Sequence, residues 1–194
     1  MRILILGASG LLGRATLPRL RGHLLVGTTR KAANCEGLAA LGARPEVCDI
    51  YDAGALARIA TAFAPEIVVN FLTDLAGGPG PGNSRIRSEG GPLVSAAARA
   101  CGARRLVVES IAFETPAPSA AAVAALEADA TQSGLEPVIL RFGRFWGPGT
   151  WSAVALAAPT VHIDVAGRRA ATLILGATPG THVVQDGDDK DDPV

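Results

Sequence analysis

Three glycines near the start of the chain have the spacing of a phosphate-binding turn. An apolar run over residues 2–6 ends at the stretch GASGLLG, which covers residues 7–13. A helix that begins in such a turn presents unpaired backbone N–H groups and the positive end of its dipole. A pyrophosphate can approach those groups only where a side chain is absent, as at Gly10. The order of strand, glycine-rich turn and helix therefore predicts a dinucleotide-binding site.

The other two glycines have separate predicted roles. Gly7 permits the sharp turn out of the strand, and Gly13 lets the helix pack closely against the sheet. The spacing is GxxGxxG rather than GxGxxG, and a glycine pattern alone is weak evidence, so an empty structural turn is the alternative. The residues of this turn expected to bind the dinucleotide are Gly7, Ser9, Gly10, Leu11, Leu12 and Gly13.

The end of the second apolar run bears on which dinucleotide binds. Thr29, Arg30 and Lys31 stand there, and no acidic residue is present to accept a hydrogen bond from a ribose 2′-hydroxyl. Two cations and a hydroxyl suit a 2′-phosphate instead. We therefore expect NADP as the cofactor, with NAD less favoured. A basic surface turn without a ligand is the alternative interpretation.

The elements that must position these residues alternate along the chain. Apolar runs separated by helical stretches are typical of a parallel sheet that is covered on both faces. The predicted fold class is therefore α/β, a doubly wound parallel sheet of the Rossmann type. Strands are predicted over residues 2–6, 24–28, 44–48, 66–72, 105–110 and 137–142, and helices over 11–21, 37–41, 53–64, 93–101 and 120–133. Residues 75–92, rich in glycine and proline, are predicted to be a long loop, either a flap over the ligand crevice or a plain surface excursion.

Composition excludes several classes of function. The 18 basic and 18 acidic residues balance, so no global field favours nucleic acid or a membrane surface. The three cysteines form no CxxC pair, so neither a metal site nor a disulfide framework is expected. An odd cysteine count, together with no recognisable signal peptide or membrane span, leads us to expect a cytoplasmic protein whose partner is a small-molecule substrate.

Together these motifs resemble the extended and atypical short-chain dehydrogenase/reductase superfamily, in the manner of its NAD-dependent epimerase/dehydratase-like members. Besides GASGLLG, the similar segments are CDIYD at residues 48–52, VVNFLTD at 68–74 and the stretch 126–149 that ends in Gly-Pro-Gly. The resemblance extends to about residue 186. It implies cofactor contacts at Asp49, Ile50, Phe71 and Leu72, and substrate contacts at Thr73, Arg144 and Trp146.

The resemblance also implies a domain organisation. Members commonly carry a substrate domain after the Gly-Pro-Gly turn, but only about 45 residues follow it here. We therefore expect a single NAD(P)-binding domain over residues 1–186, in which 150–186 form a much reduced substrate lobe, and an acidic tail over 187–194. Because helix pairs in this superfamily often form dimers, a homodimer is an assembly that the resemblance allows.

The chain departs from the superfamily at the usual catalytic residues. Members that transfer hydride usually carry a tyrosine and a lysine four residues apart, at positions that correspond to about Ser119 and Val123 here. The tyrosine exchanges the proton, and the lysine lowers its pKa. The only tyrosine of this chain is Tyr51, and no lysine lies between Lys31 and Lys190. The usual proton relay cannot be assembled from these residues.

The remaining catalytic candidates lie at the end of the fifth predicted strand. Ser110, at the usual serine position, would hydrogen-bond a substrate carbonyl, or else serve as a strand-end hydroxyl bonded to the backbone. A desolvated Glu114 would donate a proton, or else it is a solvated loop carboxylate. Glu109 is a second candidate acid there, and Asp74, just past the fourth predicted strand, has a similar claim.

Two classes of function follow. The first is an NADP(H)-dependent oxidoreductase, or an epimerase/dehydratase-like enzyme, that acts on an unknown small molecule without a tyrosine–lysine relay. The alternative is a non-catalytic NADP(H)-binding sensor or scaffold.

Overall fold

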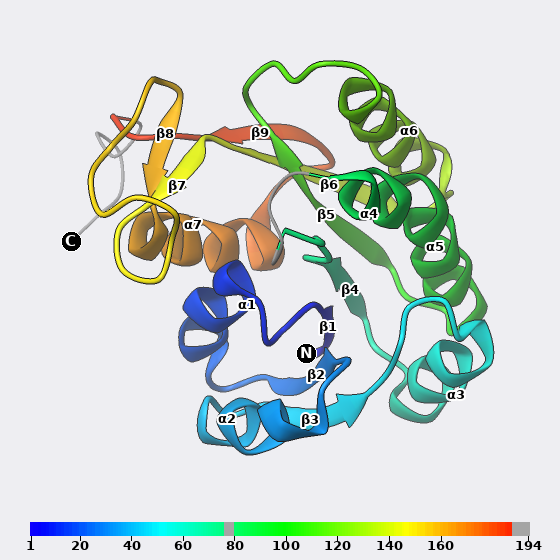
Figure 1. Ribbon diagram of the computed structural model, residues 1–194. Coiled ribbons are helices and arrows are strands. Elements are labelled where there is room, and N and C mark those ends of the chain that lie inside the picture. The colour runs from blue at the N-terminus through cyan, green and yellow to red at the C-terminus, as the bar shows by residue number, and fades with distance from the viewer. Residues whose placement is uncertain (76–79, 188–194) are drawn as a thin grey trace.

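The computed structural model describes residues 1–75 and 80–187, which form a seven-stranded sheet with helices on both faces (Figure 1). All neighbouring strands pair in parallel, in the order β3-β2-β1-β4-β5-β6-β9. The order reverses between β1 and β4, so their carboxyl ends flank the switch point at which such sheets bind ligands. The predicted doubly wound fold class is confirmed. The strands are β1 Arg2–Leu6, β2 Leu24–Thr29, β3 Arg44–Val47, β4 Ile67–Asn70, β5 Arg105–Ile111, β6 Glu136–Phe142 and β9 Gly180–Val184.

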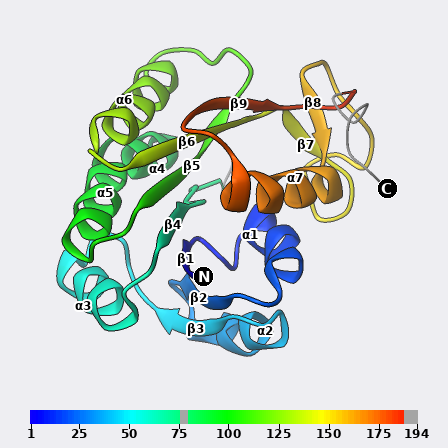
Figure 2. The same cartoon turned by 180° about the vertical axis from the view of Figure 1, so that it is seen from behind.

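Alternate residues of the central strands pack into two separate hydrophobic cores. Ile3 and Ile5 of β1 face one core, and Leu4 and Leu6 face the other. Such burial on both faces produces the continuous apolar runs seen in the sequence. Figures 1 and 2 show the two helical layers from opposite sides. One layer holds α1 Leu11–Thr16, the 3-10 turn η1 Leu17–Leu20, α2 Cys35–Ala40 and α7 Ile163–Gly176; the other holds α3 Ala53–Phe63, α4 Pro81–Arg85, α5 Gly91–Ala100 and α6 Ser119–Gln132.

The prediction of a long irregular loop over residues 75–92 was wrong for most of its described part. Residues 81–100 form consecutive helical turns: α4, the π-helical turn η3 (Ile86–Gly90) and α5. Pro81 lies in the first turn of α4, where its missing N–H is no loss. Pro92 lies in the first turn of α5, directly after the wider π turn, so the hydrogen bond that it cannot donate falls at a helix junction. Residues 76–79 lie outside the described residues.

Residues 150–186, expected as a reduced substrate lobe, contribute mainly to the layers of the sheet. Strand β9 pairs with β6 at the edge of the main sheet, and α7 packs on α1. The two helices approach closely because Gly167 has no side chain; a Cβ there would lie 2.6 Å from the backbone oxygen of Ala15. The sequence patterns did not predict β9. The predicted acidic tail lies, apart from residue 187, outside the described residues.

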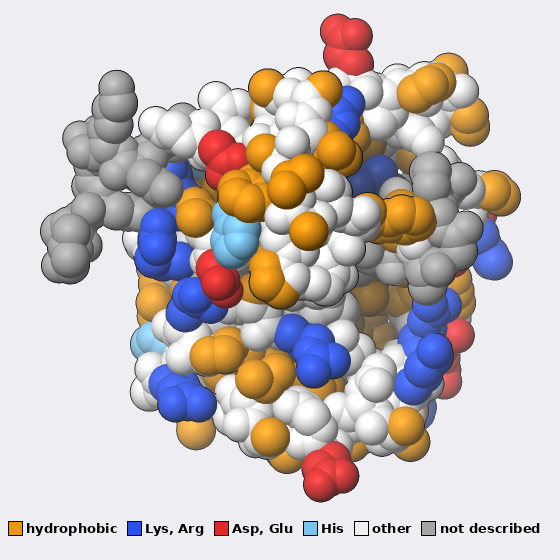
Figure 3. Space-filling model, turned by 60° about the vertical axis from the view of Figure 1, so that its left-hand side comes forward, with side chains coloured by type: hydrophobic (Ala, Val, Ile, Leu, Met, Phe, Trp, Pro, Cys, Tyr) orange, Lys and Arg blue, Asp and Glu red, His pale blue; other side chains and the backbone are white. Residues whose placement is uncertain are grey.

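A small second sheet stands beside the main one. Its strands, β7 Arg144–Trp146 and β8 Thr160–His162, pair in parallel. The segment that connects them exposes three large apolar side chains, Trp151, Val154 and Leu156. Figure 3 shows hydrophobic side chains gathered on this side of the molecule. Among the described residues, no helix has the length and apolar character to cross a membrane.

Candidate functional site

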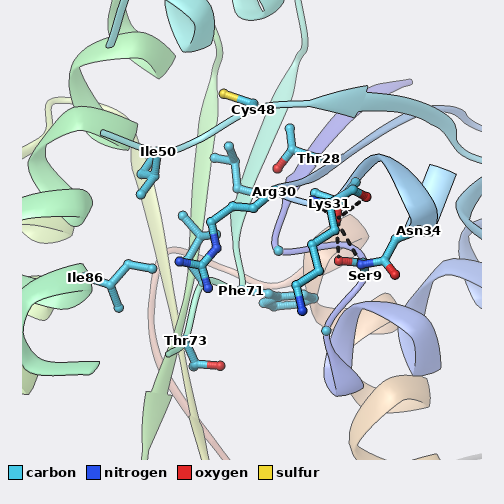
Figure 4. Close-up of a pocket in the computed structure, with 15 residues that line it drawn as sticks. Ser9, Thr28, Arg30, Lys31, Asn34, Cys48, Ile50, Phe71, Thr73 and Ile86 are labelled. Atoms are coloured by element: carbon cyan, nitrogen blue, oxygen red, sulfur yellow. Dashed lines mark hydrogen bonds between the residues drawn. The ribbon is translucent and has the colours of Figure 1, made fainter. Parts of the chain in front are cut away.

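A cavity of about 240 Å³ opens at the carboxyl ends of β1, β2 and β4 (Figure 4). The fold thus brings together the glycine turn, the end of β2 and the start of the segment after β4, although they are far apart in the sequence. The predicted site residues that line the cavity are Gly7, Ser9, Gly10, Thr29, Arg30, Lys31, Ile50, Phe71, Leu72 and Thr73. The predicted cofactor residues that do not line it are Leu11, Leu12, Gly13 and Asp49.

The glycine turn has the geometry that its sequence predicts. Gly7 has a φ of +78°, and a Cβ at this position would lie 2.5 Å from the backbone oxygen of Phe71. A Cβ on Gly13 would lie 2.5 Å from the oxygen of Ala8, so the start of α1 rests directly on the chain that leaves β1. Gly10 is the N-cap residue, and it has no side chain that could cap the first turn of α1. The free amides at this turn fit a pyrophosphate.

A hydrogen-bonded cluster fastens the end of β2 to the glycine turn. The Thr29 hydroxyl accepts a hydrogen bond from the Ser9 hydroxyl at 3.0 Å and from the Asn34 amide at 3.1 Å. It also accepts from the backbone N–H of Lys31 at 3.2 Å. Thr29 therefore orients the backbone that carries the two cations. Figure 4 shows the side chains of Arg30 and Lys31 extending from this end of β2 into the cavity.

Sequence reasoning missed several lining residues. Ile86 comes from η3, inside the segment that was predicted to be a loop, and it lies opposite the end of β2 in the cavity. Thr28, Cys48 and Asn34 stand beside predicted site residues, so adjacency to the strand ends was the available signal. Asp49 itself lies outside the lining, and its carboxylate accepts a hydrogen bond from the backbone N–H of Tyr51 at 3.0 Å.

A second hollow lies on the other side of the glycine turn. Its volume is about 600 Å³, and it is lined by Ser9 and Leu11 together with residues of the Gly-Pro-Gly turn and the start of α7. Gly149 packs there, since a Cβ at this position would lie 3.4 Å from Leu11. Leu11, predicted to contact the cofactor, thus separates the glycine turn from the turn that follows β7.

Ser110, the predicted catalytic serine, takes part in a polar network. Its buried hydroxyl donates to Glu127 Oε1 at 2.5 Å, and Arg141 Nε donates to the same oxygen at 2.9 Å. Burial opposes ionisation of Glu127, but the hydrogen bonds from Arg141 and Ser110 outweigh it and lower the pKa of this carboxyl. The network ties β5, β6 and α6 together. Ser110 does not line the cavity, and its hydroxyl proton is already engaged.

Glu109 on β5 and Glu114 in the segment after it differ in environment. Glu114 is exposed, so it lacks the desolvation on which its proposed role as a proton donor depends. Glu109 is largely buried, and its desolvation raises the pKa of its carboxyl to about 7, although the buried Arg87 guanidinium acts in the opposite direction. The same burial lowers the pKa of Arg87.

Glu109→Gln is expected to remove a pH-dependent loss of stability. Because the folded state holds the Glu109 proton up to about pH 7 and the unfolded state releases it near its ordinary pKa, wild-type stability falls as the pH rises through this window. The loss amounts to at most about 3 kcal/mol. Urea unfolding should therefore show that the free energy of unfolding of the variant, relative to that of the wild type, is higher at about pH 8 than at about pH 5. A difference between the two proteins that is equal at both pH values would contradict the assignment.

The predicted substrate residues Arg144 and Trp146 make contacts within the protein. Trp146 Nε1 donates to Asp186 Oδ2 at 2.7 Å, and its ring meets the edge of His162 at a centroid distance of 4.6 Å. The Arg144 guanidinium lies 4.2 Å from the ring centroid of Phe113. The contacts with Asp186 and Phe113 hold the small β7–β8 sheet against the rest of the fold. Of the three predicted substrate residues, Thr73 lines the cavity.

Comparison with known proteins adds the family context. A model of the NAD-dependent epimerase/dehydratase family matches residues 3–110, more than half of the chain. A curated Streptomyces protein named 3-diazoavenalumate denitrifying reductase is 35% identical over 180 residues. That match covers 77% of this chain and 58% of the relative, so the chain spans less than two thirds of the relative's length.

Solved structures share the fold at low identity. A Bacillus halodurans protein described as an NAD-dependent epimerase/dehydratase superposes with a TM-score of 0.81 at 20% identity, covering 97% of this chain and 95% of that one. UDP-glucose 4-epimerase from Thermus thermophilus, in complex with NAD, gives a TM-score of 0.78 at 19% identity, covering 97% and 78%. A dTDP-glucose 4,6-dehydratase from Streptomyces venezuelae, with NAD bound, gives 0.74 at 19% identity, covering 95% and 75%.

Proposed function

Because the chain belongs to the NAD-dependent epimerase/dehydratase family, we propose that it is an NADP(H)-dependent oxidoreductase that acts on a small molecule without a tyrosine–lysine relay. The observation that carries this proposal is the cavity at the switch point, where the bare glycine turn, Arg30 and Lys31 face the same space (Figure 4). Among the described residues that line it, none is acidic. The solved epimerase and dehydratase from Thermus thermophilus and Streptomyces venezuelae hold NAD, so the preference for NADP rests on the two cations.

The residues present fit a dinucleotide phosphate. The backbone amides that open α1, directly after Gly10, would hold the pyrophosphate, and Arg30 with Lys31 would hold the 2′-phosphate. Ile50 and Ile86 present apolar surface for the adenine. When bound, the reduced nicotinamide supplies a hydride. What the chain itself provides is orientation of the reactants and exclusion of water, rather than a tyrosine proton donor.

The missing relay favours a substrate that needs no proton from the protein. Reduction of a ketone or aldehyde leaves an alkoxide that must be protonated. Replacement of the leaving group of an aromatic diazonium balances without a proton, as ArN2+ plus hydride gives ArH plus N2. The name of the 35% identical Streptomyces relative describes a reductase that acts on a diazo compound. We therefore propose an aromatic diazonium as the substrate class.

Turnover with a deuterated cofactor tests this function. The purified protein would be incubated with NADPH carrying deuterium at the nicotinamide C4, and with either a hydroxyaryl diazonium salt or a panel of aldehydes and ketones. We expect cofactor oxidation, release of N2 and deuterium in the arene product, with the carbonyl panel inactive. Carbonyl turnover without diazonium turnover would exclude the proposed substrate class.

A non-catalytic NADP(H) sensor or scaffold is the second candidate. It is favoured by one observation: three of the five expected catalytic and substrate residues, Ser110, Arg144 and Trp146, have side chains engaged in internal contacts. Under this alternative, calorimetry would detect NADP(H) binding while no acceptor in either group oxidised the cofactor.

A further inference from the structure

We propose that Asp74 is a specificity-determining residue: its carboxylate pairs with Arg30 in the free protein and competes with the 2′-phosphate of NADP for the same guanidinium. The inference rests on the proposed function, because it concerns the same cavity. It adds that the chain carries an internal anion at the 2′-phosphate position, which weakens its own preference for NADP over NAD.

The first observation is an ion pair between segments on opposite sides of the cavity. Arg30 follows β2, Asp74 follows β4, and their side chains meet at 3.5 Å. Arg30 and Thr73, the neighbour of Asp74, both line the cavity. Figure 4 shows the Arg30 side chain reaching across the cavity toward the side of Thr73. The pair therefore lies where the 2′-phosphate would meet Arg30.

The second observation is that α4 fixes Asp74 in this position. The backbone N–H of Asp74 donates to Oδ1 of the buried Asn83 at 3.0 Å. Gly82 leaves room for the Asp74 carboxylate, because a Cβ on this glycine would overlap with Oδ2. Asn83 and Gly82 both belong to α4, which lies in the segment that the sequence patterns predicted to be an irregular loop. Asp74 is thus oriented toward Arg30 by packing, whereas an ordinary surface carboxylate samples many positions.

The third observation is the unequal state of the two cations. Within the part of the chain that the structure describes, Asp74 is the carboxylate paired with Arg30, and none lies within ion-pair distance of Lys31. The cavity mouth therefore presents one compensated and one uncompensated cation. An incoming 2′-phosphate would have to displace the Asp74 carboxylate from Arg30 and would remain close to its negative charge. A ribose 2′-hydroxyl meets neither cost.

The experiment is isothermal calorimetry of NADP+ and NAD+ binding to Asp74→Asn. Asparagine keeps the shape of the side chain and the backbone hydrogen bond to Asn83 but removes the charge. We expect NADP+ to bind roughly threefold to tenfold more tightly, and NAD+ to change by less than about twofold. The gain should shrink at high salt, where the exposed pair is screened. In an Arg30→Gln background, the same Asp74 substitution should raise the NADP+ affinity by less than it does in the wild type, because only the repulsion between the Asp74 charge and the phosphate is then removed.

Glu46→Gln is the matched control. The Arg44–Glu46 pair has the same 3.5 Å separation and similar exposure, but neither of its residues lines the cavity, so its loss should leave both affinities unchanged. An Asp74→Asn affinity for NADP+ that is unchanged or weaker, or an equal gain for NAD+, would overturn the competition while the proposed function stood. If neither the wild type nor Asp74→Asn bound either dinucleotide, both the proposed function and this inference would fail. Thermal melting of each variant identifies any loss of fold.

Discussion

Replacing Gly7 with alanine is expected to destabilise the protein by roughly 2–5 kcal/mol and to abolish dinucleotide binding. The added Cβ would lie 2.5 Å from the backbone oxygen of Phe71 and 2.8 Å from its carbonyl carbon. Phe71 cannot retreat easily, because its own N–H donates to the oxygen of Leu6 at 3.0 Å. The positive φ of Gly7 adds backbone strain for any L-residue. Urea unfolding measures the first effect, and calorimetry with NADP+ the second.

Substitutions at two other glycines distinguish backbone strain from the steric clash with Phe71. Gly42 has a φ of +91°, and a Cβ there would meet no atom within 4 Å, so Gly42→Ala carries strain alone and should cost about 1 kcal/mol. Gly37 lies inside α2 with an ordinary φ and open space, so Gly37→Ala should stabilise the protein by about 0.5–1 kcal/mol. A Gly7→Ala variant no less stable than Gly42→Ala would show that the contact with Phe71 does not constrain the turn.

The sequence patterns predicted the parts of the fold that depend on local order. Each apolar run of the central sheet is buried on both faces, so its position was readable without knowing its neighbours. The sequence patterns missed β9 because this short strand lies at the sheet edge. Its residues, such as His182 and Val183, differ in exposure, so they form no continuous apolar run. The helical turns at residues 81–92 were missed because proline was counted as a helix breaker, whereas both prolines occupy first turns.

The residues of the candidate site were likewise predictable only where local order marks them. The glycine turn and the cations after β2 were readable because each lies next to a strand end. The partners of those residues come from distant segments, as Asp74 and Ile86 do, and only the folded chain brings them near Arg30. Ser110 was placed correctly at the end of β5, yet its hydrogen bond to Glu127 depends on how α6 packs on the sheet. Side-chain pairing across elements leaves no periodic signal in a single sequence.

Removing both cations after β2 is expected to erase the preference for NADP. The double substitution Arg30→Gln and Lys31→Gln should weaken NADP+ binding by at least roughly 100-fold, because each charge-assisted hydrogen bond to a phosphate contributes about 1.5–3 kcal/mol. The affinity for NAD+ should change little, since the 2′-hydroxyl carries no charge. Calorimetry with both dinucleotides gives the ratio of the two affinities directly. The backbone at this turn should survive the change, because Thr29 is held through its hydroxyl and not through either cation.

The control removes two cations elsewhere. Arg58 on α3 and Arg99 on α5 are exposed and lie outside the cavity, so their double replacement by glutamine lowers the net charge equally. If that control weakened NADP+ as much as the Arg30 and Lys31 pair did, the cations would act through general attraction and not through a 2′-phosphate contact. If instead the Arg30 and Lys31 variant lost NAD+ and NADP+ affinity in equal proportion, these side chains would serve the pyrophosphate common to both. Selective loss of NADP+ is therefore the outcome that assigns the two cations to the group by which the dinucleotides differ.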